Sequence, residues 1–468
     1  MNDPGTCCSR RVLRAAFVGL AVGLGWGIRG DFGHQLGAMV PGALLGLGLG
    51  YVSGQDKIFR MLPALGFVAA VTMSIGGTMS YGTLHGYAQS DSFINSTYGF
   101  LTLFLLGGVW GGPCGAGLGL LLEDKRPRFK QWLHCVTTVL VYGFLTYTVV
   151  VSFLHFHINP PRSDCSIGFM GGMAGLFIWL YKRQMWMGFK GALYGFIGFG
   201  LAMSLSRLAA NISCIFPVIY DNWKIMEIGC GMIGGFVTSY ALLGKELKSD
   251  SLKPWEDGVA RVGLFFVMVG IPVLHKLQRL TPDIIRQDVA ASAAVLRFEN
   301  VDAVAARLHA FSVVILLVAV AGSFIWLHLY RRNLVRFSAF PVLWLAGTML
   351  VIQNVKALFP FTHVQETIGR YRVGLSFWIL FILMILFVAF WKRRPFVRPK
   401  EASENPRLGL AVVWSLAIFI LMLAANAPVN HLAEKYGYQR PDGSRNIPRN
   451  SSNTRFPIGT YRDRARQR

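Results

Sequence analysis

The sequence predicts an all-helical protein that crosses a membrane many times. Hydrophobic residues make up 53% of the 468 positions and charged residues only 15%, and the mean hydropathy is +0.46. This balance is typical of polytopic membrane proteins and excludes an ordinary soluble domain. Apolar runs long enough to cross about 30 Å of hydrocarbon recur along most of the chain. Backbone groups in lipid need partners within the protein, and no period-two alternation is present, so we expect helices rather than a barrel.

Thirteen apolar segments are expected to be transmembrane helices. Their expected ranges are 12–28, 35–53, 61–80, 98–122, 132–154, 167–181, 187–207, 225–243, 259–274, 308–330, 340–359, 373–391 and 408–427. Glycine usage divides them, because 41 of the 52 glycines precede Ser249. We therefore expect a Gly-rich membrane region over 1–250 and a Gly-poor five-helix membrane region over 251–430.

The Gly-rich region contains a recurring pattern of glycines, then bulky residues, then a charged connection. It is clearest from Gly42, Gly112, Gly168 and Gly231, and the lysines that follow are about one helical hairpin apart. We interpret the first eight helices as four tandem Gly-rich hairpins that point the same way. Glycines three or four positions apart also allow close helix packing in lipid, which by itself explains most of them.

Positive charge is distributed as expected for a membrane protein with a cytoplasmic N-terminus. With that orientation, inner connections hold 23 Lys and Arg residues and short outer loops hold 6. The net charge of +23 thus reflects topology and not binding to nucleic acid. We expect an integral protein of a plasma or bacterial inner membrane. Cys165 and the sequons at Asn95 and Asn211 then fall in outer segments.

Two further segments are assigned from composition. Apolar residues recur at helical spacing within 278–307, which predicts an outer helical connection at the membrane interface. The tail over 431–468 is basic and lacks apolar periodicity, which predicts disorder. Thirteen crossings place this tail outside.

The stretch from Leu24 to Gly50 contains the strongest candidate site. Its two apolar halves flank Arg29, Asp31 and His34, and ionisable groups at this depth are often functional. If the hairpins surround one axis, these side chains converge on an outer vestibule. The full set of candidate substrate-binding or ion-binding residues is Arg29, Asp31, His34, His85, Arg207 and Glu227. The alternative is that Arg29 and Asp31 pair with each other in an ordinary polar loop and that His34 caps a helix.

Secondary candidates lie elsewhere. Lys190 is near the inner end of its helix, where extension to the lipid headgroups competes with an internal ion pair. The remaining candidates are Gln353, Asn354 and Lys356, near the outer end of the eleventh helix, and His363, Glu366 and Arg370, which follow it. The His–Glu pair among them suits acid–base chemistry, but a solvated loop is the favoured interpretation.

These features lead to two hypotheses of function. The first is a transporter or channel for a small polar solute or ion, with its vestibule on the outer side of the hairpins. The alternative is a membrane-embedded transferase or hydrolase that acts at the outer face on a lipid-linked substrate. Histidine spacing matches no zinc motif, and no Walker loop or common hydrolase motif occurs, so we expect neither a metal nor a cofactor. The expected partners are the lipid bilayer and the substrate.

Overall fold

A computed structural model gives the architecture, and every element in the described part of the chain is a helix. The described residues are 4–90, 93–159, 162–213, 215, 222–244, 246–247, 252–296, 300–334, 338–353, 366–391 and 408–436. Within them, nine helices are long and apolar enough to cross a membrane. Four apolar helices are shorter, at Leu62–Gly76, Phe340–Gln353, Leu375–Phe390 and Val413–Asn426. These helices indicate an integral membrane protein, whereas thirteen crossings remain a prediction.

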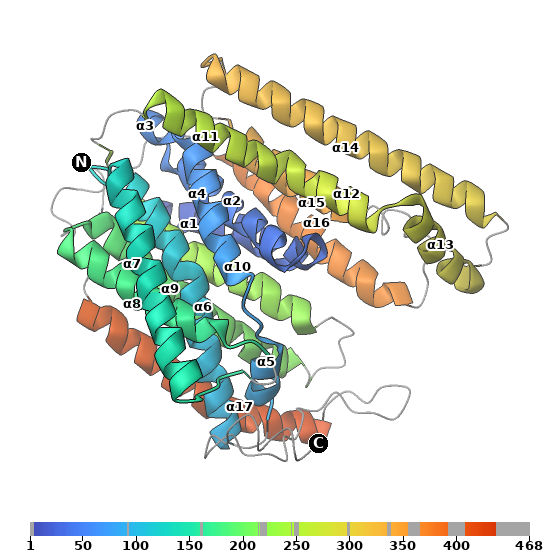
Figure 1. The fold of residues 1–468 in the computed structure, drawn as a ribbon. Coiled ribbons are helices and arrows are strands. Elements are labelled where there is room, and N and C mark those ends of the chain that lie inside the picture. Colours follow the sequence, from blue (N-terminus) through green and yellow to red (C-terminus); the bar gives the residue numbers. More distant parts are fainter. Residues whose placement is uncertain are drawn as a thin grey trace.

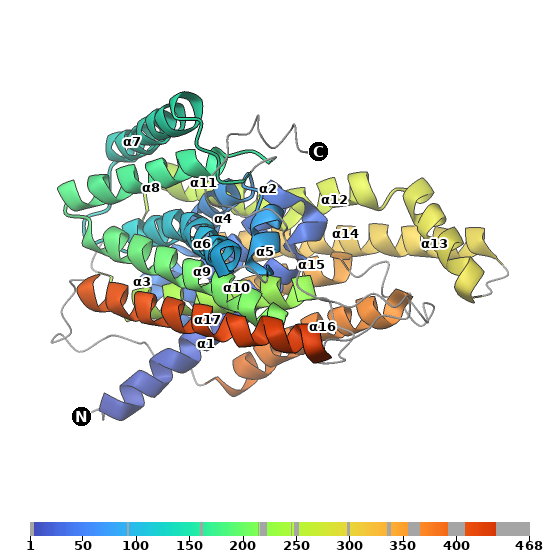
Figure 2. The ribbon, with the colours of Figure 1, turned by 90° about the horizontal axis from the view of Figure 1, so that it is seen from below.

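Six helices from the first half of the chain close into a ring (Figures 1 and 2). They are α1 (Pro4–Ile28), α2 (His34–Ser53), α4 (Leu62–Gly76), α6 (Phe93–Leu121), α9 (Trp186–Ser213) and α10 (Asn222–Leu242). Each packs against the next, and α10 packs back against α1. Two short helices, α3 (Asp56–Phe59) and α5 (Gly82–Ala88), lie in connections between them.

Glycine determines how closely the ring helices approach one another, most clearly between α6 and α9. A Cβ added to Gly111 would lie 2.3 Å from the carbonyl oxygen of Gly195, and one added to Gly115 would lie 2.0 Å from that of Gly191. Residue numbers increase along α6 while those of the contacting residues on α9 decrease, so the two helices are antiparallel. Any side chain at these crossings would force the backbones apart.

Two more helices pack outside the ring. They are α7 (Phe129–Tyr147), which continues into the π-helical turn η2 (Thr148–Phe153), and α8 (Cys165–Lys182). Helix α8 packs against α7 and also contacts α6 and α9. Only 6% of the apolar window of the α7–η2 span is buried. This part of the Gly-rich region therefore presents a broad apolar surface, as a helix in contact with lipid does.

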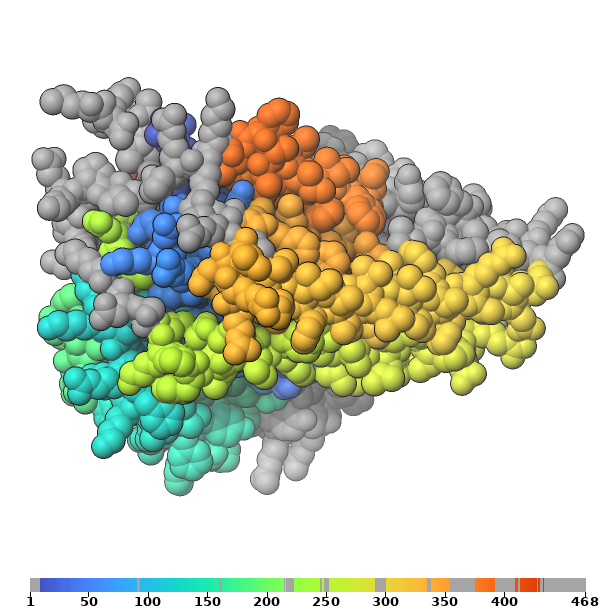
Figure 3. Space-filling model, turned by 90° about the horizontal axis from the view of Figure 1, so that it is seen from above, coloured from blue at the N-terminus to red at the C-terminus, as the bar shows by residue number. Residues whose placement is uncertain are grey.

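Helices from the second half of the chain pack against the ring at several places. A long helix, α11 (Pro254–Phe265), runs through the π-turn η3 (Phe266–Gly270) into α12 (Ile271–Arg279). The exposed helix α14 (Val301–Arg331) lies beside it, as the space-filling view in Figure 3 shows. Helix α15 (Phe340–Gln353) contacts α1, α2 and α14. Two others contact the ring directly, α16 (Glu366–Phe390) at α1 and α17 (Leu408–Tyr436) at α9.

The predicted special segments are described only in part. The connection over 278–307 contains the helix α13 (Pro282–Leu296), which packs on α14, while its place at a membrane interface stays a prediction. The first residues of the predicted disordered tail, 431–436, are instead the end of helix α17. The remainder of the tail lies outside the described residues.

Candidate functional site

Two connections between ring helices meet at the end of the ring where α1 stops. There the 3₁₀ turn η1 (Arg29–Phe32) follows α1, and the chain between α4 and α6 folds into α5. Gly33 ends the η1 turn at a φ of +89°, a conformation that side chains rarely adopt. A Cβ on Gly37 would lie 2.0 Å from the carbonyl oxygen of Arg29. The turn therefore packs directly on α2 and directs Arg29 inward.

Arg29 is the centre of a buried ion network. Its guanidinium donates to the hydroxyl of Tyr81, and Nη2 lies 3.6 Å from Oε1 of Glu227. Lys224 donates to Oε2 of the same carboxylate at 2.8 Å and to the carbonyl oxygen of Gly27 at 2.8 Å. The exposed fractions of the Arg29 and Glu227 side chains are 1% and 3%. The network links α1, the chain before α5 and the first turns of α10 through charged groups shielded from solvent.

Aromatic rings surround the guanidinium. Its central carbon lies 4.9 Å from the ring centroid of Trp110, 5.1 Å from that of Trp26 and 5.6 Å from that of Tyr81. Trp26 in turn lies 4.9 Å from Trp110 and stacks on Phe199 at 5.4 Å. These three rings come from α1, α6 and α9, and they fill the interior of the ring beside Arg29. Their faces stabilise the cation where water is excluded.

His85 lies next to this network. Its ring centroid is 5.3 Å from that of Tyr81 and 5.0 Å from that of Trp223. Both ring nitrogens are buried and have no hydrogen-bond partner among the described residues. Burial, followed by the positive charge of Arg207, holds the pKa of His85 well below its ordinary value, so the imidazole is neutral. Burial also raises the pKa of Tyr81, which keeps its phenol protonated.

A chain of hydrogen bonds runs from Arg207 on α9 to Asn426 on α17 and back to Ser96 on α6. Arg207 Nε donates to Oδ1 of Asn211 at 2.9 Å, and Asn211 Nδ2 donates to Oδ1 of Asn426 at 3.1 Å. Asn426 Nδ2 then donates to Oγ of Ser96 at 2.7 Å. All four side chains are buried. The chain therefore joins α9, α17 and α6 by polar contacts inside an apolar bundle.

The structure brings together four of the six primary candidates and separates two. Arg29, His85, Arg207 and Glu227 are all buried at this end of the ring, whereas Asp31 and His34 are exposed. The expected vestibule is therefore an enclosed cluster at Arg29. The partners of Arg29 are Tyr81 and Glu227, in place of the Asp31 pair that the alternative interpretation required.

The secondary candidates do not join this cluster. Lys190 is buried near the start of α9, some 17 positions before Arg207, which corresponds to about 25 Å along a helix. Gln353 is the last described residue of α15, and Glu366 and Arg370 lie on the first turns of α16. Asn354, Lys356 and His363 lie outside the described residues.

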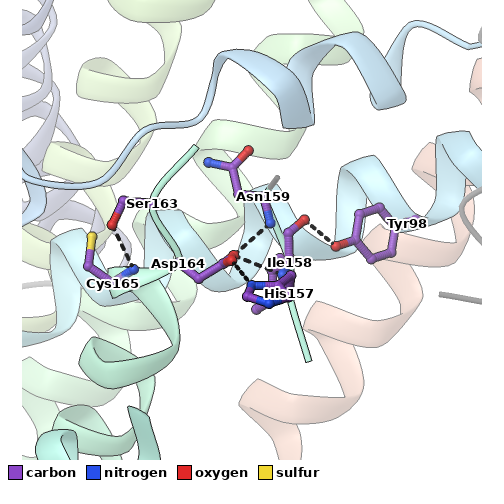
Figure 4. Close-up of polar contacts among 7 residues, drawn as sticks. All are labelled: Tyr98, His157, Ile158, Asn159, Ser163, Asp164 and Cys165. Carbon is purple, nitrogen blue, oxygen red and sulfur yellow. Dashed lines mark hydrogen bonds and ion pairs between the residues drawn. The ribbon is translucent and has the colours of Figure 1, made fainter. Parts of the chain in front are cut away.

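The loop after η2 has a structural arrangement of its own (Figure 4). Oδ1 of Asp164 accepts the backbone N–H groups of Ile158 at 2.8 Å and Asn159 at 2.7 Å, and Oδ2 pairs with Nδ1 of His157 at 2.7 Å. Tyr98 of α6 donates to the carbonyl oxygen of Ile158. These contacts explain His157 and Asp164 as residues that hold the loop. Among the described residues, no three His, Cys, Asp or Glu side chains are grouped to hold a metal ion.

Sequence reasoning missed the aromatic members of the cluster and Lys224. Tyr81, Trp26, Trp110 and Trp223 look like ordinary residues of apolar helices, and Lys224 resembles a residue of a solvated connection. One usable signal was present, since an aromatic residue lies three or four positions before Arg29, His85 and Glu227. Comparison of the chain with family models, with curated proteins and with solved structures finds no match.

Proposed function

We propose that the protein is a multi-pass membrane transporter or channel for a small polar solute or ion, whose path passes Arg29. One observation carries the proposal. Nε and Nη1 of this buried arginine have no hydrogen-bond partner among the described residues. Buried donors without partners are costly, and a buried arginine in a membrane bundle usually faces a partner or a substrate.

The interrupted helices support a path rather than a purely structural ion pair. Arg29 lies in η1 and His85 in α5, so both are on short helices between longer ones. Transporters commonly form substrate sites where helices break, because backbone groups and side chains are then released towards the substrate. In this proposal the ring helices line the path, and α1–α2, α4–α6, α7–α8 and α9–α10 are four tandem hairpins within thirteen crossings. The cluster then lies on the outer side.

The geometry favours transport over the enzyme alternative. Both oxygens of Glu227 are engaged by cations, at 3.6 Å and 2.8 Å, so this carboxylate is held in a charge network instead of facing a substrate as a free base. A separate apolar pocket lies between α14, α15 and α16, and Thr348 is the one hydroxyl-bearing residue among those that line it. That pocket suits a lipid chain but has few groups for chemistry.

Reconstitution into liposomes tests the proposal. Swelling of protein-containing vesicles is recorded in isotonic sodium lactate, sodium phosphate, ammonium chloride, urea and glycerol, beside protein-free vesicles. We expect at least one solute to enter faster with the protein and Arg29→Gln to abolish the difference. The matched control is Arg14→Lys, since Arg14 is buried in α1, which leads into η1, but donates to the carbonyl oxygens of Val52 and Ser53 at the other end of the ring. Equal swelling with and without protein for every solute would overturn the proposal.

A further inference from the structure

We infer that the ligand of the Arg29 cluster is a small organic monocarboxylate, an inference that rests on the proposed function. The first argument is the chemistry of the unpartnered groups. Nε and Nη1 of Arg29 and Nε1 of Trp110 are buried, and within the described residues they have no acceptor. Arginine and tryptophan side chains donate hydrogen bonds and accept none. The missing partner must therefore be rich in acceptor oxygens.

The second argument is charge. Arg29 and Lys224 share the single carboxylate of Glu227, so these three groups, counted as ionised, hold one positive charge in excess. An excess charge excluded from water needs a counter-ion. His85 is neutral and adds no charge, whereas Arg207, which acts on His85, adds to the positive charge near the triad. A ligand with one negative charge would balance this triad, whereas a cation would add to its repulsion.

The third argument concerns what surrounds the charge. Trp26, Trp110 and Tyr81 lie within 5.6 Å of the guanidinium carbon, and Trp223 stacks on Tyr81 with ring centroids 5.7 Å apart. Such a surface favours an anion that also carries a hydrocarbon part.

Open space lies beside two glycines next to the cluster. A Cβ added to Gly30 or to Gly86 would meet no atom within 4 Å. These glycines directly follow Arg29 and His85 in the chain. The donor atoms of Arg29 and Trp110 are themselves buried, so a carboxylate would reach them through a local opening at these glycines and would then accept from both. One nitrogen of the neutral His85 supplies a further donor.

The test compares lactate with its neutral amide, lactamide, because the two differ mainly in charge. Thermal unfolding of the purified protein is followed as each compound is titrated, since a ligand that binds the folded state raises the melting temperature. We expect a saturable rise with lactate and none with lactamide. Arg29→Gln should weaken lactate binding about 10- to 100-fold, the usual loss for a charge-assisted hydrogen bond. Arg14→Lys should retain it.

Glu227→Gln gives a result that a merely structural role does not predict. This substitution raises the excess charge of the triad from one to two, so lactate affinity should increase. If Arg29→Gln fails to fold, Trp110→Phe is the alternative variant. It should weaken lactate binding because it removes one hydrogen-bond donor. Equal melting shifts with lactate and lactamide, or a shift with inorganic phosphate and none with lactate, would overturn the carboxylate assignment.

Binding and swelling together separate the two proposals. If the vesicles admit urea, glycerol or ammonium while lactate neither binds nor enters, transport stands and the carboxylate assignment is wrong. If lactate binds through Arg29 but no solute enters faster than in empty vesicles, the ligand assignment stands and the transport proposal is wrong.

Discussion

Arg29 and Glu227 lie 3.6 Å apart and connect the end of α1 with the first turns of α10, two helices from opposite ends of the Gly-rich region. They meet because α10 packs back on α1 and closes the ring. At this crossing a Cβ on Gly231 would lie 2.5 Å from the carbonyl oxygen of Val22. The ion pair therefore depends on close backbone contact between α1 and α10. A substitution that separates these two helices should also separate Arg29 from Glu227.

Gly115→Leu should destabilise the protein strongly. Its side chain would have to displace the backbone of Gly191, whose carbonyl oxygen lies 2.0 Å from the position of a Cβ. We expect a loss of about 3 kcal/mol or more, since overpacking against flexible side chains already costs about 1–3 kcal/mol. Thermal unfolding in detergent measures the effect. Gly258→Ala on α11 is the control, where an added Cβ meets no atom within 4 Å, and it should be neutral or slightly stabilising.

His85 should make stability depend on pH. The unfolded chain takes up a proton on this imidazole as the pH falls through about 6.5, whereas the folded chain resists protonation because burial and Arg207 lower the pKa of His85. The contribution of His85 to the free energy of unfolding is complete above that pH. Below it, this contribution is lost by about 1 kcal/mol for each pH unit. As the pH is lowered from 8 to 5, the melting temperature should therefore fall less steeply for His85→Gln than for the unmodified protein. The exposed His34→Gln should keep the original slope, and identical slopes for all three proteins would contradict the prediction.

Asn426→Ala should weaken the attachment of α17 to the ring. The substitution removes the acceptor of Asn211 and the donor to Ser96, and each buried group left without a partner costs about 1–3 kcal/mol. A double-mutant cycle with Asn211→Ala isolates the coupling between the two amides. We expect the double variant to be less destabilised than the sum of the single variants, and strict additivity would show that the Asn211–Asn426 contact contributes little.

Cys165 offers a test of membrane orientation. It lies at the start of α8, half-buried and without a disulfide, beside the loop predicted to be outside. A membrane-impermeant maleimide added to intact cells should label this thiol, and Cys165→Ser should lower the labelling, while Cys214, also predicted to lie outside, accounts for any that remains. Labelling that appears only after the membrane is permeabilised would place this end of α8 inside and reverse the predicted topology.

The helices were predictable because long apolar runs in a membrane have few alternatives. Their mutual arrangement was not, since periodicity does not specify which helices touch. Arg29 and Asp31 illustrate the difference, because they are two positions apart yet η1 buries the first and exposes the second. Asn95 and Asn211 are 0% and 1% exposed within helices, which the sequence did not indicate. That these sequons lie on the outer side of the membrane stays a prediction.

The stack of Trp26, Trp110 and Phe199 has a consequence for how such a path would operate. A solute held at Arg29 and moving away from the open end meets three fully buried rings contributed by three helices. In such a path these buried rings would close the way beyond the cluster. Passage would require the stack to part, by rotation of Phe199 or by separation of α1 from α6 and α9. The tryptophans that stabilise the arginine would then also act as the gate of the proposed path.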